Sequence, residues 1–186
     1  MGQFLAMGFA HEIATSLNDL RKKEISNKEL RQEIEQTLLF DLNLYDETET
    51  DGYLSFTLKD QVLETDLIPF LEAIYPMLYD KENEEEYHKL LKQLHSTPST
   101  EWLDLAQEKS NAAFQFDMYA EPRYVRAPNN FFQSIRLDFE CVMLYLGYGK
   151  ISTEGINDFL DFFKRCIHET FKEYPIVKAI HIYVTG

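Results

Sequence analysis

The sequence predicts an α+β domain, in which a mostly antiparallel sheet is packed against helices that lie mainly on one of its faces. Segments with the pattern of strands and of helices follow one another in the order βαββα, then αα, then ββαβ. The length of 186 residues is that of one domain. With 45% hydrophobic residues, including 14 Phe and 11 Tyr, the chain can build one full core. We therefore predict a single domain over residues 1–186.

The N-terminal segments predict one strand and two helices. Residues 3–10 are apolar or small at both odd and even positions, which is typical of a central strand covered on both faces. A short helix is predicted over residues 16–23. In the next segment Ser26 and Glu29 have the spacing of a capping box, and apolar residues follow at helical spacing up to residue 38. This segment is the clearest helix in the sequence.

A hairpin and three helices are predicted next. Asp51-Gly52 lies between two segments of strand character, and glycine accepts the positive φ that a tight hairpin turn requires. The spacing of apolar residues then predicts helices over residues 65–79, 83–95 and 98–109. Pro76 is expected to kink or end the first of these helices, because proline removes a backbone hydrogen bond.

The C-terminal half is richer in strands. Alternation of apolar and polar residues predicts strands over residues 112–120 and 134–149. Apolar residues at helical spacing predict a long helix from Thr153 to Glu173. Residues 175–186 are predicted to form the last strand.

A loop is predicted over residues 119–132, between the first two of these strands. It contains Arg123 and Arg126 among tyrosine, proline and phenylalanine residues. Arginine and tyrosine are favoured at protein interfaces, so the two arginines are candidate partner-binding residues. The alternative is that the loop only crosses the fold and its aromatic rings pack into the core.

Negative charge is concentrated in one region of the chain. Twelve of the 14 net negative charges come from residues 41–86, which hold fourteen acidic residues and, as bases, only Lys59 and Lys81. If the acidic clusters at residues 46–51 and 80–86 lie at one end of the fold, they form a negative surface that attracts a basic protein. Otherwise they are ordinary solvated charge. The candidate partner-binding residues are Glu47, Glu49, Asp51, Glu84, Glu85 and Glu86.

No motif for catalysis or metal binding accompanies this charge. Residues 47–58 begin like a calcium-binding loop, but Leu58 stands where that loop needs a bidentate glutamate. Glu85 and His88 have the spacing of a di-iron ligand pair, but the sequence contains no second copy of the pair. We therefore assign no catalytic residue and expect neither a metal nor a cofactor.

A second candidate site lies on the polar side of the predicted strands. Residues that alternate along a strand share one face of the sheet, and two carboxylates beside a histidine could perform acid–base chemistry. The competing interpretation is an ordinary solvated face of an antiparallel sheet. The residues of this alternative ligand site are Asp117, Arg136, Asp138, Glu140 and His181.

Composition narrows the classes of function. A pI near 4.7 disfavours nucleic-acid binding, because phosphates are repelled. The apolar N-terminal stretch is too short for a membrane span, and two cysteines do not suggest an oxidising compartment, so we expect a cytoplasmic protein. The leading hypothesis is a non-enzymatic protein that binds a basic protein partner, as an inhibitor or an immunity-type protein does. The alternative is a small-molecule-binding protein or enzyme that uses Asp138 and Glu140. The oligomeric state is left open.

Overall fold

The computed structural model describes residues 4–78, 84–98, 101, 118–124, 136–147 and 153–185. Nearly all of the helix predicted over residues 98–109 lies outside these residues, as do Asp117, Arg126 and most of the strand predicted over residues 112–120.

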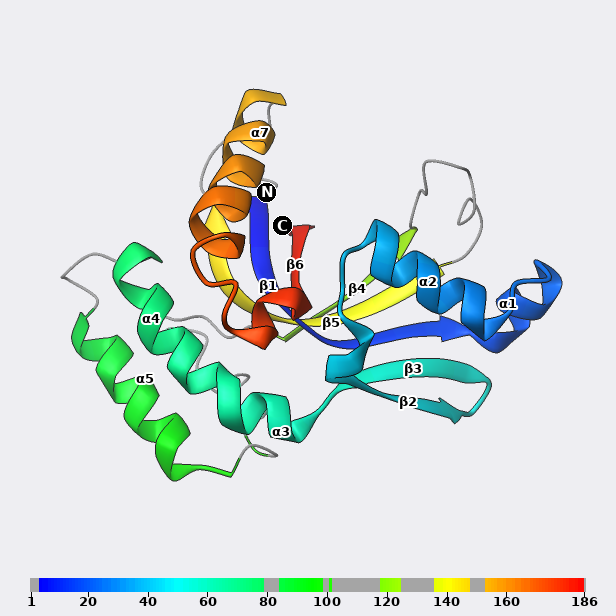
Figure 1. Ribbon diagram of the computed structural model, residues 1–186, viewed down its shortest axis with the longest axis horizontal. Coiled ribbons are helices and arrows are strands. Elements are labelled where there is room, and N and C mark those ends of the chain that lie inside the picture. The colour runs from blue at the N-terminus through cyan, green and yellow to red at the C-terminus, as the bar shows by residue number, and fades with distance from the viewer. Residues whose placement is uncertain are drawn as a thin grey trace.

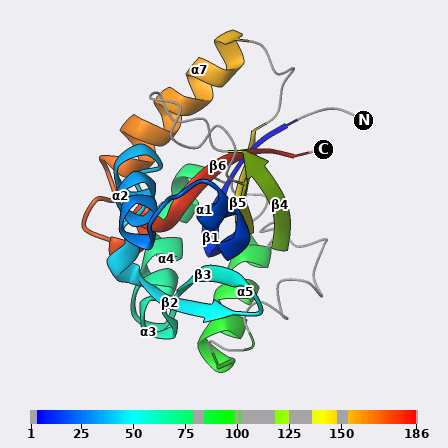
Figure 2. The same ribbon diagram turned by 90° about the vertical axis from the view of Figure 1, so that its right-hand side faces the viewer.

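The described strands form one antiparallel sheet of six strands, as Figure 1 shows. Five strands follow the order β2-β3-β1-β5-β4, and β6 pairs with β1. In Figure 2 helices α2, α4 and α7 lie together on one side of the strands. The predicted α+β class is confirmed. The strands are β1 (Phe4–Ser16), β2 (Tyr45–Thr50), β3 (Tyr53–Leu58), β4 (Met118–Tyr124), β5 (Arg136–Gly147) and β6 (Ile180–Thr185).

Strand β1 is the centre of the sheet. One of its edges pairs with β5 over residues 5–14. The other edge pairs with β6 over residues 4–9 and then with β3 over residues 12–16. Residues 6–10 of β1 are all buried, so this part of the strand is covered on both faces, as its composition predicts.

The first two helices confirm the local signals in the sequence. Helix α1 covers Leu17–Lys22 and α2 covers Asn27–Thr37. The backbone N–H of Glu29 donates to Oγ of Ser26 at 3.3 Å, and the backbone N–H of Ser26 donates to Oε2 of Glu29 at 2.9 Å. This reciprocal pair is the predicted capping box, and it satisfies two donors at the start of α2.

The middle of the chain is helical after a short 3₁₀ turn, η1 (Leu42–Leu44), and the β2–β3 hairpin. Helix α3 (Asp60–Val62) leads through the π-helical segment η2 (Leu63–Leu67) into α4 (Ile68–Leu78). Pro76 does not end α4, which continues to Leu78. Helix α5 (Glu84–Ser96) lies beside α4 (Figure 1), where Nε2 of His95 is 3.5 Å from Oε1 of Glu72.

The C-terminal region corrects three boundaries. The predicted helix from Thr153 is regular only in α7 (Thr153–Asp161), becomes π-helical in η5 (Phe162–His168), and gives way to turns over residues 169–173. The last strand begins at Ile180, because Pro175 starts the 3₁₀ helix η6 (Pro175–Ala179).

The third correction concerns residues 121–124, which continue the strand as part of β4 and do not belong to the predicted loop. They pair with β5, which gives their backbone groups a partner. Pro122 is tolerated within this segment, because β4 is an edge strand of the described sheet and one side of its backbone needs no donor for a neighbouring strand.

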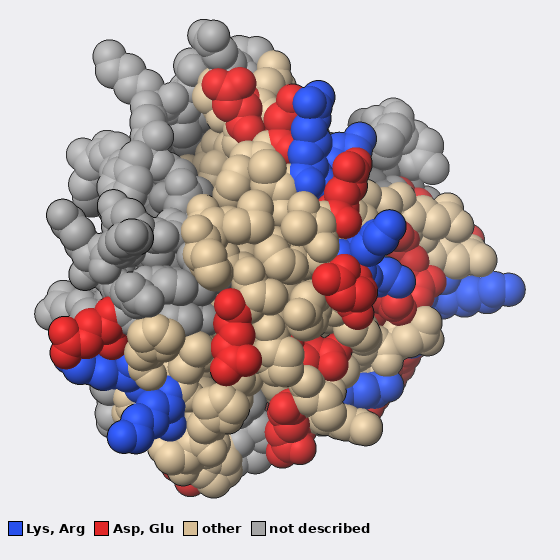
Figure 3. All heavy atoms as spheres, turned by 60° about the vertical axis from the view of Figure 1, so that its left-hand side comes forward, with Lys and Arg blue, Asp and Glu red and all other residues tan. Residues whose placement is uncertain are grey.

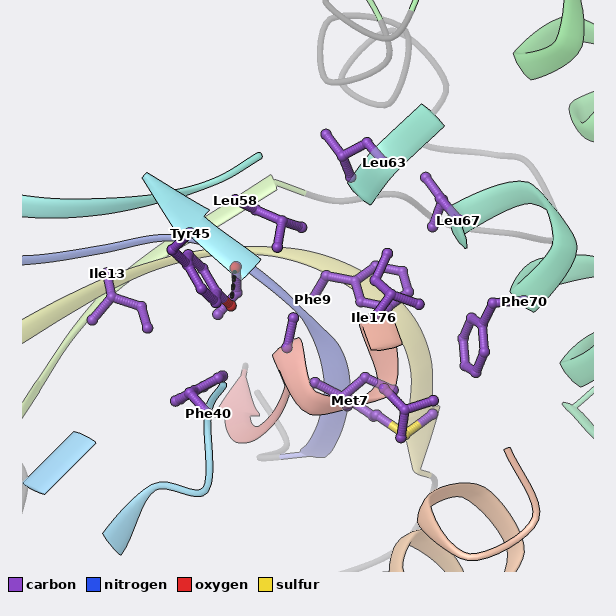
Figure 4. Packing of buried hydrophobic residues seen from close by; sticks show 14 of the residues in the cluster. Met7, Phe9, Ile13, Phe40, Tyr45, Leu58, Leu63, Leu67, Phe70 and Ile176 are labelled. Atoms are coloured by element: carbon purple, nitrogen blue, oxygen red, sulfur yellow. Dashed lines mark hydrogen bonds between the residues drawn. The ribbon is translucent and has the colours of Figure 1, made fainter. Parts of the chain in front are cut away.

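The core joins helices from distant parts of the chain to β1 (Figure 4). The ring centroid of Phe70 on α4 lies 5.7 Å from that of Phe9 on β1 and 5.8 Å from that of Phe171. Near the hairpin, the ring of Tyr45 packs edge-on against Phe40 at 6.4 Å. The Tyr45 hydroxyl donates to the carbonyl of Ala10 at 2.9 Å, so the start of β2 is tied to the middle of β1.

Candidate functional site

The turn of the β2–β3 hairpin attaches the acidic outer strand β2 to helix α1. Asp51 and Gly52 have φ values of 50° and 83°, which is the left-handed conformation that the Asp-Gly pair predicts. The carbonyl of Gly52 accepts a hydrogen bond of 2.9 Å from the backbone N–H of Leu17, the first residue of α1. The tip of the hairpin is therefore attached to the helix that follows β1.

Two carboxylates of β2 are bound by side chains of α2. Glu47 forms an ion pair with Arg31, whose guanidinium also lies 5.8 Å from the ring centroid of Phe56. Oε1 of Glu49 accepts a hydrogen bond of 2.9 Å from Nδ2 of Asn27. Glu47 and Glu49 thus attach the hairpin to α2, and the charge of Glu47 is compensated within the chain.

The other acidic positions of this region line up across the sheet. Asp46 of β2 is opposite Thr57 of β3, Thr57 is opposite Glu12 of β1, and Glu12 is opposite Glu140 of β5. Directly opposite residues of antiparallel strands share one face, and neighbouring strands are about 4.8 Å apart. We call Asp46, Glu12 and Glu140 the acidic row. Glu47 and Glu49 bind α2, and Glu47 is one position from Asp46, so by alternation it belongs to the opposite face.

The acidic row connects the acidic strand β2 with the polar residues of β5, which are far apart in the sequence. Asp138 is opposite Ala14, which in turn is opposite Ser55, so Asp138 lies one row further along the same face as Glu140. Arg136 shares this face by alternation. The polar residues of β5 and the acidic strand β2 therefore belong to one half of the sheet.

Glu12 is the member of this site that sequence reasoning misses. It is partly buried, whereas Asp46 is exposed at the outer strand. Nothing near Glu12 in the sequence indicates that it will lie opposite Glu140, because this pairing comes from the register of β1 and β5. The pairing could be predicted only if the order of the strands were known.

The predicted convergence of His181 with the carboxylates of β5 is not formed in the described sheet. His181 is opposite Gly8, and its ring lies 5.7 Å from that of Phe40. Gly8 is four residues from Glu12 along β1, or roughly 13 Å, and β6 lies on the other edge of β1 from β5.

Arg123 lies apart from the acidic row as well. It is opposite Leu137, which is fully buried, and alternation therefore places it on the other face from Asp138. Asp117 and Arg126 are outside the described residues.

The described part of the second acidic cluster, in α5, lies far from the hairpin. Glu84, Glu85 and Glu86 belong to the first turn of α5, where Oε1 of Glu85 is 3.2 Å from Nζ of Lys89. Figure 1 places α5 and the β2–β3 turn at opposite ends of the long axis. On the side that faces the viewer in Figure 3, acidic and basic residues are interspersed around a broad uncharged area. The described parts of the two clusters therefore form separate patches.

Comparison with known proteins assigns no family. No protein-family model matches the chain, and no curated protein or solved structure is significantly similar to it. Among the described residues, no group of three or more His, Cys, Asp and Glu side chains is arranged to hold a metal ion. No helix in the described part of the chain has both the length and the apolar character needed to cross a membrane.

Proposed function

We propose that this chain is a protein-interaction protein that binds a basic protein partner at one end of its sheet. The binding surface would comprise the acidic row and the outer strand β2 with its turn. The observation that supports this proposal is the register of four adjacent strands, which lines up Asp46, Glu12 and Glu140 on one face.

A surface of this kind attracts cations for a simple reason. Like charges directly opposite one another on neighbouring strands destabilise a sheet. By register Glu12 and Glu140 are such a directly opposite pair, and lysine or arginine side chains of a partner would compensate charge at these positions. The attraction would speed the encounter of the two proteins and would weaken as salt is added.

The hairpin is also organised before any partner arrives. Arg31 and Asn27 hold Glu47 and Glu49, and Leu17 holds the turn. A surface that is already ordered loses little conformational entropy on binding, so more of the interaction energy contributes to affinity. An inhibitor or immunity-type protein in the cytoplasm that neutralises a basic protein is one form of this function.

The alternative function at the same face has less support. An enzyme or small-molecule site at Asp138 and Glu140 would use a nearby proton carrier, and His181 is separated from them along β1. The binding proposal needs no such group.

The test uses two variants of equal charge. Asp46→Lys with Asp51→Asn changes the charge of the hairpin while leaving the contacts of Glu47 and Glu49 in place, and asparagine tolerates the left-handed backbone at residue 51. Glu84→Lys with Glu85→Gln makes the same change of net charge on α5. A partner would first be captured on wild-type protein from a lysate of the source organism and eluted along a salt gradient. Its association rate with each variant would then be measured by stopped flow.

We expect the hairpin variant to lower the association rate constant about tenfold at low salt. The α5 variant should change it by less than about twofold. Equal losses in both variants would show that only net charge matters. No loss in the hairpin variant would contradict the proposed surface directly.

A further inference from the structure

The middle of β1 contains a break in the pairing of the sheet. Along one edge, β6 ends opposite Phe9 and β3 begins opposite Glu12, so neither strand pairs with Ala10 or His11. Along the other edge, β5 pairs with Ala10 and with Glu12 but skips His11. His11 is therefore the extra residue of a β-bulge. We call Ala10 and His11 the sheet junction.

The sheet junction separates two parts of the molecule. On one side of it β1 pairs with β6, and on the other side it pairs with β3, which carries the hairpin. Figure 1 shows β1 changing direction between these two parts. Bulges bend strands and increase their twist, which explains why the change of direction occurs here.

His11 is poorly accommodated at this position. It is partly buried, and its Nδ1 atom is fully buried without a hydrogen-bond partner among the described residues. Burial lowers the pKa of His11 below its ordinary value, and the carboxylates of Glu12 and Asp60 offset only part of that effect. The imidazole is therefore kept in its neutral form by its surroundings.

The charges around the sheet junction offer partners to a protonated imidazole. Two lysines of the neighbouring segments have partners of their own. Nζ of Lys59 donates to the carbonyl of Asn43 at 2.7 Å, and Nζ of Lys178 lies 3.4 Å from Oδ2 of Asp41. The carboxylates that act on His11 are those of Glu12 on β1 and Asp60 in α3. Lys59 precedes Asp60, Lys178 lies in η6, which packs against β1, and Glu140 is opposite Glu12 by register.

We propose that His11 is a pH-sensitive switch at the sheet junction. When the imidazole is neutral, it fills the bulge and holds the two parts of β1 in their present arrangement. When it gains a proton, its charge requires hydration or a carboxylate, and the carboxylates that act on it belong to Glu12 and Asp60. The side chain would move toward them and leave the bulge unsupported. This inference does not depend on the proposed binding function.

The sign of the effect follows from proton linkage. A histidine with a lowered pKa binds fewer protons in the folded state than in the unfolded state near pH 6. Its contribution to stability is complete above the ordinary pKa of about 6.5 and is lost as the pH falls through the folded-state pKa. Acidification should therefore loosen the sheet junction.

The test is amide hydrogen exchange near neutral pH and near pH 5, corrected for intrinsic exchange rates. Wild-type protein should lose protection over residues 9–13 by about tenfold on acidification. His11→Gln, which keeps a neutral polar side chain, should lose less than about twofold. His168→Gln, at an exposed histidine of η5, is the matched control and should behave like wild type.

A second measurement does not depend on any variant. NMR titration of the imidazole carbons of wild-type protein should give His11 a pKa below its ordinary value of about 6.5. Asp60→Asn should lower the pKa of His11 further, because one favourable carboxylate is removed. The proposal is overturned if His11 titrates at or above its ordinary pKa of about 6.5. It is also overturned if wild type and His11→Gln lose protection over residues 9–13 equally.

Discussion

At the scale of single residues, Ser26 shows how a local signal becomes measurable stability. Its hydroxyl and the Glu29 carboxylate cap α2 reciprocally. We expect Ser26→Ala to lower the free energy of unfolding by about 1 kcal/mol, because a backbone donor loses its partner. Urea denaturation followed by circular dichroism would measure the change. Ser96→Ala, at the far end of α5, is the control and should change stability by less than about 0.5 kcal/mol.

The same cap has a pH dependence in the same direction as that of His11, but in a more acidic range. Hydrogen bonds from Ser26 hold the pKa of Glu29 below its ordinary value. Its contribution to stability is complete above the unfolded pKa and is lost as the pH falls through the lower folded-state pKa. The difference between wild type and Ser26→Ala should therefore shrink in strongly acidic solution.

Leu39 is a residue whose replacement should stabilise the fold. It has a φ of 63°, and its side chain is 72% exposed, so the left-handed backbone gains little compensation from packing. Leu39→Gly should raise the free energy of unfolding by about 0.5–1 kcal/mol, because glycine adopts this conformation without strain. Leu39→Ala removes the same side chain but keeps the strain, and it should give no such gain. Equal stabilisation by both variants would show that strain is not the cause.

Tyr45 links β2 to the centre of the sheet through one hydroxyl. Tyr45→Phe should cost about 1–2 kcal/mol, because the carbonyl of Ala10 loses a buried hydrogen bond. Tyr53→Phe removes a hydroxyl from a ring that is 48% exposed and should be nearly neutral. Thermal unfolding of the two variants would give the comparison, and a neutral Tyr45→Phe would contradict the assigned role.

At the scale of elements, the β2–β3 turn depends on backbone conformation alone. A Cβ placed on Gly52 would meet no atom within 4 Å, so any cost of Gly52→Ala comes from its φ of 83°. We expect a loss of about 1 kcal/mol in urea denaturation. The substitution should also lower the affinity for a partner that binds the hairpin, if that partner contacts the turn.

Most elements could be predicted because their signals are local. The capping box, the Asp-Gly turn and the apolar spacing of α4 and α5 each lie within a short stretch of sequence. Residues 121–124 were predicted only as loop, because their pairing with β5 is a tertiary contact that no local pattern reports. Strand β6 begins five residues later than predicted, because Pro175 starts a 3₁₀ helix. The run of apolar residues from which the strand was predicted does not distinguish this helix from a strand.

At the scale of the whole molecule, the candidate site was predictable only in part. The concentration of charge over residues 41–86 is visible in the sequence. The neighbours of each charge are not visible in it, because Arg31 compensates Glu47 from another element and strand register places Glu140 opposite Glu12. A shift of register by one residue would place Glu12 on the other face, and the three residues of the acidic row would no longer be aligned.

Net charge should also govern stability as a function of salt. The chain carries a formal net charge of −14, and repulsion among these charges opposes compactness. Salt screens this repulsion over a Debye length of about 10 Å at 0.1 M. We therefore expect the midpoint of thermal unfolding to rise by a few degrees between low and moderate sodium chloride concentrations. A falling midpoint would show that attractive pairs such as Arg31 and Glu47 outweigh the repulsion.

The central position of β1 has a consequence for synthesis on the ribosome. Its C-terminal part pairs with β3, which lies some forty residues further along the chain. In the described part of the sheet, residues 4–9 pair with β5 and β6, which are made much later. The nascent chain would therefore carry an apolar strand without these partners until β5 is made. Such segments aggregate or recruit chaperones, and long-range pairing of this kind folds slowly. The chain should consequently refold more slowly than a helical protein of its length, and its yield should depend on chaperone supply.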